Sequence, residues 1–167
     1  MLLSTSNPSP DELLGIYLND HLTGASVGVE LIRRSAKGQL AAHRRTELSR
    51  LAAEVEQDRA SLVSLMKTLG APVQKHRVAA GWAVEKLGRL KPNGTWVHRS
   101  PLSDVIELES LRLGVEGKLC LWRLLRQFAD TDTRISIVDL DDLEERAVGQ
   151  IETLEAMRLE AGEALRA

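Results

Sequence analysis

The sequence predicts an all-α fold, an antiparallel bundle of four long helices. Only 3% of its residues are aromatic while 43% are hydrophobic, and a core of Leu, Ala and Val is typical of helices packed on helices rather than of a β-sandwich. Four long segments repeat their apolar residues at helical spacing. The length of 167 residues suits one core. We therefore treat residues 1–167 as a single domain, with residues 1–9 as an N-terminal tail.

The first two helices have clear boundary signals. Ser9 caps a helix over residues 10–36, Pro10 occupies its first position and Glu12 completes a capping box. A second helix over residues 39–69 stops at Gly70, which suits the left-handed cap position, and Pro72 follows. The apolar stripe of this second helix contains Leu48, Leu51, Val55, Leu62, Leu65, Met66 and Leu69, with Asp58 as its polar interruption.

Residues 70–100 form a connector between the second and third long helices. Pro72 opens a shorter amphipathic helix over residues 72–90, and the turn residues 91–94 end it. A connector of this length carries the chain from one end of a bundle back to the other. From Lys75 to Arg99 it has a net charge of +5, whereas the chain from Asp130 onward has −7. These opposite charges predict docking of the connector on the acidic end or contacts between molecules, with Trp82 and Trp96 as anchors.

The last two helices follow this connector. Ser100 and Pro101 start a helix that runs to Phe128, and residues 130–133 form a polar loop. Residues 135–138 are predicted to be extended. Asp139 then caps a fourth helix that continues to residue 165.

Two helix pairs joined by a long crossover resemble the ferritin-like superfamily of four-helix bundles. The segments 17–24 (YLNDHLTG) and 116–122 (EGKLCLW) also look like bacterial members of that superfamily. The resemblance implies a ferritin-like bundle with a helical crossover, and in metal-binding members a Glu on each of two helices and Glu-x-x-His on the other two. This chain departs from that motif, since none of its Glu residues has His three positions later. The second helix offers Glu54 and Asp58, and the fourth offers Ala147 and Gln150. We expect no working di-metal centre and no cofactor.

A degenerate metal site is the alternative. It would use His21 from the first apolar stripe, Asp58 and Glu116, with Glu54 and Glu109 as lesser candidates, and would hold iron or manganese. The competing interpretation makes His21 a core histidine hydrogen-bonded to a carboxylate such as Asp58. Glu47, Glu54 and Asp58 would then form an edge row that faces solvent.

Three further features have structural interpretations. The charged row of the third helix is expected to form a seam of ion pairs; it consists of Glu109, Arg112, Glu116, Arg123 and Gln127. Gly24 and Gly28 are expected to allow close helix approach, or else to leave room for a small ligand. Cys120 is expected to be an inert core thiol.

Composition and motifs limit the function. The net charge of −2 predicts no binding to nucleic acid or membranes, and a single cysteine without a secretory leader predicts the cytoplasm. The chain has no Walker loop, dinucleotide fingerprint, nucleophile elbow or zinc spacing. We expect a binding or self-associating protein, a homodimer rather than an enzyme, because the third helix is apolar on more than one side. The alternative function is a metal-dependent redox or iron-binding protein.

Overall fold

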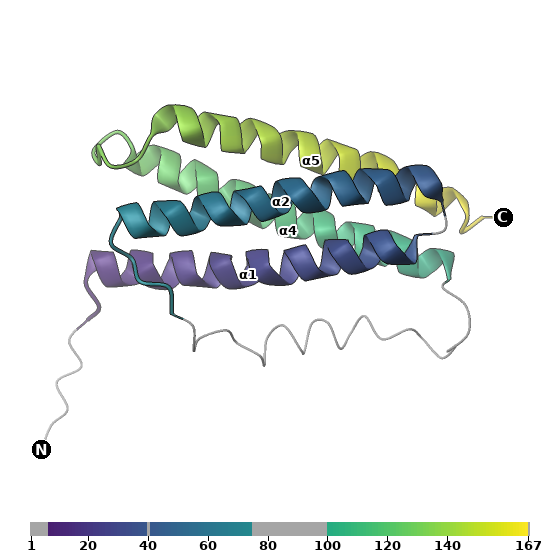
Figure 1. Cartoon of the computed structure of the whole chain (residues 1–167), viewed down its shortest axis with the longest axis horizontal. Coiled ribbons are helices and arrows are strands. Elements are labelled where there is room, and N and C mark those ends of the chain that lie inside the picture. The colour runs from purple at the N-terminus through teal and green to yellow at the C-terminus, as the bar shows by residue number, and fades with distance from the viewer. Residues whose placement is uncertain (1–6, 40, 75–99, 167) are drawn as a thin grey trace, which may run out of the picture.

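Four long α-helices make up the described part of the chain, which comprises residues 7–39, 41–74 and 100–166 of a computed structural model. They are α1 (Pro10–Gly38), α2 (Ala42–Thr68), α4 (Pro101–Phe128) and α5 (Ile137–Glu163). The predicted all-α four-helix bundle is confirmed (Figure 1).

The chemistry predicted for the start of α1 and the end of α2 is present, but α2 begins at Ala42 rather than at residue 39, because Gln39 is the C-cap of α1. The Ser9 backbone N–H donates to Glu12 Oε2 at 2.7 Å, and the Glu12 N–H donates to Ser9 Oγ at 3.3 Å. At the end of α2, Gly70 has a φ of 72°, the left-handed conformation that favours glycine. The Ala71 and Gly70 N–H groups donate to the Met66 and Lys67 carbonyls, so the end of α2 is a Schellman cap.

The second hairpin differs from prediction at one end. Helix α4 begins and ends at the predicted residues, with Ser100 as its N-cap. The predicted extended segment 135–138 is wrong, because α5 already begins at Ile137. Its N-cap is Ser136 rather than Asp139: the Ser136 hydroxyl accepts the Asp139 N–H at 3.2 Å. A serine cap three residues upstream satisfies the Asp139 N–H, so Asp139 lies inside the first turn of α5 rather than at its cap.

The four helices pack as two antiparallel pairs, α1 with α2 and α4 with α5 (Figure 1). Figure 1 also shows that α2 and α4 run in the same direction, so α4 begins at the end of the bundle opposite to the one where α2 ends. Helix α1 packs on α4, whereas α2 and α5 meet at fewer points. The two pairs are therefore joined mainly along α1 and α4.

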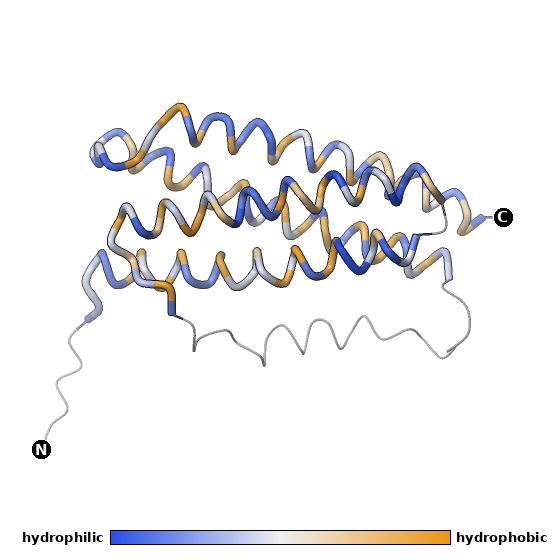
Figure 2. The backbone as a smooth tube through the Cα atoms, in the orientation of Figure 1, coloured by the Kyte–Doolittle hydropathy of each residue, from blue (hydrophilic) through white to orange (hydrophobic). Residues whose placement is uncertain are grey.

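The core lies between the helices and consists mostly of leucine. Trp122 and Leu18 are among the largest fully buried side chains. Figure 2 shows hydrophobic and hydrophilic residues alternating around each helix turn, as helices with one buried face require. None of the described helices is both long enough and apolar enough to span a membrane.

The connector lies mostly outside the described residues. Residues 71–74 are not helical, so the predicted helix over 72–90 does not begin at Pro72; its remainder, Trp82 and Trp96 lie outside. Asn19 of α1, 6% exposed, fixes the start of the connector. Its Nδ2 donates to the Pro72 carbonyl at 3.0 Å, and its Oδ1 accepts the Gln74 N–H at 2.8 Å. The chain thus leaves α2 along α1.

Candidate functional site

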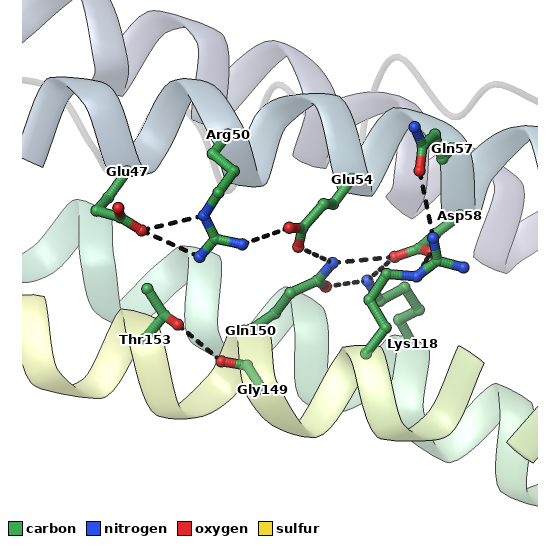
Figure 3. Close-up of polar contacts among 10 residues, drawn as sticks. Glu47, Arg50, Glu54, Gln57, Asp58, Lys118, Gly149, Gln150 and Thr153 are labelled. Carbon is green, nitrogen blue, oxygen red and sulfur yellow. Dashed lines mark hydrogen bonds and ion pairs between the residues drawn. The ribbon is translucent and has the colours of Figure 1, made fainter. Parts of the chain in front are cut away.

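The main polar feature of the core is a group of side chains from three helices, which we call the interior cluster. It consists of Glu54 and Asp58 from α2, Lys118 from α4, and Arg146 and Gln150 from α5. Figure 3 shows α2 facing α5 across this cluster, with Lys118 reaching in from α4. The cluster lies where α2 and α5 would otherwise have little contact.

Asp58 is the centre of the interior cluster. Its side chain is 1% exposed, so its charge needs compensation from within the protein. Lys118 Nζ donates to Asp58 Oδ2, and Arg146 Nε lies 3.0 Å from Asp58 Oδ1. The second contact is an ion pair without the alignment of a hydrogen bond, since neither atom has a hydrogen-bond partner within residues 7–39, 41–74 and 100–166. Two cations therefore surround one buried carboxylate.

Gln150 forms hydrogen bonds to both the positive and the negative side chains of the cluster. Its Oε1 accepts from Lys118 Nζ. Its Nε2 donates to Glu54 Oε2 at 3.1 Å and to Asp58 Oδ2 at 3.3 Å. The amide thus turns its oxygen to the cation and its nitrogen to the two carboxylates, as complementary polarity requires.

The edge of the cluster leads to solvent along α2. Arg50 pairs with Glu54 and also with Glu47, at 3.0 Å (Figure 3). Arg146, 31% exposed, also donates to Gln57 Oε1 at 3.3 Å. Burial lowers the pKa of Lys118, and the neighbouring Asp58 carboxylate partly opposes that shift by favouring the ammonium form. The buried centre and the half-exposed edge form one continuous network.

The predicted ligands do not come together as a metal site. In residues 7–39, 41–74 and 100–166, no group of three or more His, Cys, Asp and Glu side chains is arranged to hold a metal ion. His21 makes an edge-on contact with Tyr17, with ring centroids 4.5 Å apart, and burial lowers its pKa. Glu116 pairs with Arg112 at 3.3 Å, and Glu109 with Arg158 at 3.4 Å.

Several structural interpretations from the sequence need correction. Asp58 bonds to Lys118 and Gln150 rather than to His21, and it does not face solvent. Cys120 is exposed and is not a core thiol. Gly24 and Gly28 do not serve close helix packing, because a Cβ at either would contact no described atom within 4 Å.

Two other predictions concern the ion pairs of the charged row on α4 and the room for a small ligand near Gly24 and Gly28. The charged row of α4 does form ion pairs, mostly to α5: Arg112 with Glu155 at 3.4 Å, and Arg123 with Glu144 at 3.7 Å. A shallow hollow lies between α1 and α2, away from Gly24 and Gly28. Its lining residues are Arg33, Ala36, Lys37, Arg45, Ser49, Ala52, Ala53 and Glu56.

Sequence reasoning missed Lys118 and Arg146. Lys118 lies on the buried face of α4, between Val115 and Trp122, and so interrupts an apolar stripe as Asp58 does. A polar residue within the apolar stripe of α4 was therefore the sequence signal that could have identified Lys118. A lysine is easily overlooked there, because its long stem packs on apolar surface while its charge lies elsewhere.

We compared the chain with models of protein families, with curated proteins and with solved structures, and none of these comparisons gives a match. The chemistry of the site therefore rests on its own residues. A carboxylate, an amide oxygen and two resident cations make an internal ion-pair network, which binds helices together.

Proposed function

We propose that this chain is a ferritin-like four-helix bundle that acts by self-association, as a homodimer joined through the outer face of α4. The observation that carries the proposal is a line of exposed side chains on that helix, which we call the α4 stripe: Leu102, Ile106, Leu113 and Cys120. Spacings of four and seven residues place them on one side of the helix.

The α4 stripe has the character of an interface. Leu113 is 67% exposed, Leu102 47% and Ile106 39%, although α4 already buries eight residues in the core. Single exposed leucines are common on protein surfaces, but an apolar line along one helix marks a binding surface. A second copy is the simplest partner, because a two-fold axis lets one apolar patch cover itself.

The surroundings of the stripe permit that approach. Two carboxylates lie on or at the edge of the stripe, and both are paired within the chain: Glu109 with Arg158 and Glu116 with Arg112. A second copy would therefore meet no row of uncompensated like charges. Gly117 borders the stripe, and a Cβ there would contact no atom of the described residues within 4 Å, so a neighbouring helix has room to come close.

The ferritin-like assignment is part of the proposal. It is supported by the parallel direction of α2 and α4 and by the long connection that this direction requires (Figure 1). The residues do not fit a di-metal centre, because Lys118 and Arg146 place two positive charges beside Asp58. We derive no metal chemistry for this chain, and association is the function that its surface favours.

The test compares the molar mass of three proteins by light scattering and sedimentation at micromolar concentration. We expect a mass twice the 18.4 kDa of the chain for the unchanged protein. Leu113→Glu places a charge in the interface and should weaken association at least ~100-fold, or ~2.7 kcal/mol. The control Leu159→Glu, at a site 58% exposed on α5, should leave the dimer intact. A monomeric unchanged protein, or equal effects of the two variants, contradicts the proposal.

A further inference from the structure

The position of Lys118 Nζ is defined by two oxygens that belong to other helices. Asp58 Oδ2 comes from α2 and Gln150 Oε1 from α5, and their side chains are 1% and 2% exposed. Because both side chains are buried between helices, and Gln150 is also bonded to Glu54 and Asp58, the surroundings restrict where these oxygens lie. Lysine only supplies the group between them.

The orientation of Gln150 makes this place selective for a hydrogen-bond donor. The Gln150 Nε2 is held by Glu54 and Asp58, at 3.1 and 3.3 Å, so its Oε1 must face the opposite way. An ammonium group has three N–H donors and no acceptor, and it satisfies two such oxygens directly.

The net charge of the surrounding network also favours an occupant with a single positive charge. The network joins three acidic and three basic side chains: Glu47, Asp58, Glu54, Arg50, Lys118 and Arg146. Loss of the Lys118 ammonium would leave this network, which includes the buried Asp58, with a net charge of one negative. Arg146 Nε, 3.0 Å from Asp58 Oδ1, disfavours a divalent ion there.

We propose that Asp58 and Gln150 form a receptor for a primary ammonium group, which the chain fills with its own Lys118. When Lys118 is shortened, a small primary alkylammonium ion will bind in its place. The interior cluster is then a built cation site whose natural occupant is part of the chain. This site is independent of the α4 stripe and of self-association.

The experiment uses Lys118→Ala in the full chain. This variant removes three carbons and the nitrogen, which are the heavy atoms of n-propylammonium. We expect n-propylammonium chloride to raise the Tm by about 4 °C at ten times its Kd, and by a further increment for each tenfold increase in its concentration. Tetramethylammonium chloride at the same concentration has no N–H donor and should give no comparable rise in Tm. The unchanged protein, whose site is filled, should respond equally to both salts.

A second variant locates the effect. Asp58→Asn combined with Lys118→Ala removes the carboxylate, and the difference between the two salts should disappear. Equal effects of both salts on Lys118→Ala, or a larger rise with Mn²⁺ or Zn²⁺ than with n-propylammonium, overturn the proposal. If Lys118→Ala is unfolded alone, recovery of helical circular dichroism replaces the melting curve. Recovery with n-propylammonium but not with tetramethylammonium supports the proposal, and recovery with neither or with both overturns it.

Discussion

The ammonium group of Lys118 on α4 contacts the carboxylate of Asp58 on α2 inside the helical core. Asp58 is 1% and Lys118 12% exposed, so neither charge has much water to stabilise it. Each charge offsets the desolvation of the other, and Gln150 bonds to both. This contact joins the two helix pairs on the side of α2 and α5, which pack on each other less than α1 and α4 do.

Removing the charge of Asp58 should strongly destabilise the bundle. Asp58→Asn leaves Lys118 and Arg146 as neighbouring cations without a buried carboxylate, which costs about 3–5 kcal/mol. The measurement is urea unfolding followed by circular dichroism. Glu47→Gln, at a residue 43% exposed, is the matched control and should change the free energy of unfolding by less than ~0.5 kcal/mol. Similar losses in the free energy of unfolding from the two variants would mean that the burial of Asp58 does not determine its contribution to stability.

Replacing both partners with apolar residues should be tolerated better than replacing one. Asp58→Leu alone leaves the Lys118 ammonium buried. Asp58→Leu with Lys118→Met removes both buried charges; it leaves Arg146, which is 31% exposed and reaches solvent, and the Gln150 amide oxygen, which loses its Lys118 donor. We expect the double variant to be at least ~2 kcal/mol more stable than Asp58→Leu. The free energies of unfolding of the four proteins in this cycle give the coupling. Strictly additive effects would show that the two residues do not interact.

His21 should make the fold sensitive to mild acid. Burial lowers its pKa below the ordinary value of 6.5, and Asp20 only partly opposes this shift. Between the lowered pKa and 6.5 the unfolded chain binds more protons, so the free energy of unfolding falls as the pH falls below 6.5. An NMR titration of the ring should give a midpoint below 6.5. A midpoint at or above 6.5 contradicts this, and His21→Gln should show a smaller loss of stability at low pH.

Two glycines should respond oppositely to alanine. Gly24→Ala should raise the free energy of unfolding by about 0.5–1 kcal/mol, because an exposed helical glycine gains helix propensity and its Cβ meets no described atom. Gly70→Ala should lower it by ~1 kcal/mol or more, since its φ of 72° strains an L-residue. Urea midpoints of both variants check this contrast. A destabilising Gly24→Ala would indicate that something packs against this part of α1.

Local chemistry explains which parts of the fold were predictable. The capping pair Ser9 and Glu12 and the stop at Gly70 act within a few residues, so the sequence alone indicates those helix ends. The start of α5 was misplaced because Ser136 and Asp139 are both good cap residues, and the sequence does not distinguish them; the structure uses Ser136.

The interior cluster was only half predictable. Asp58 attracts attention because a carboxylate in an apolar stripe requires a partner. Its partners lie 60 and 92 residues away in the sequence, at Lys118 and Gln150, and only the crossing of three helices brings them together. Glu116, one of the predicted ligands, is two positions from Lys118 and so lies on another face of α4, where it pairs with Arg112 in the charged row.

Metal titration of the unchanged protein tests most directly whether Lys118 completes the interior cluster. After exhaustive chelation, the protein is melted alone and with one equivalent of Fe²⁺, Mn²⁺ or Zn²⁺, and bound metal is measured by elemental analysis. Because the ammonium group already holds the oxygens of Asp58 and Gln150, we predict a Tm within ~1 °C in all samples and less than about 0.1 equivalent of bound metal. A rise of several degrees with one equivalent bound would contradict this account and favour the metal-binding alternative.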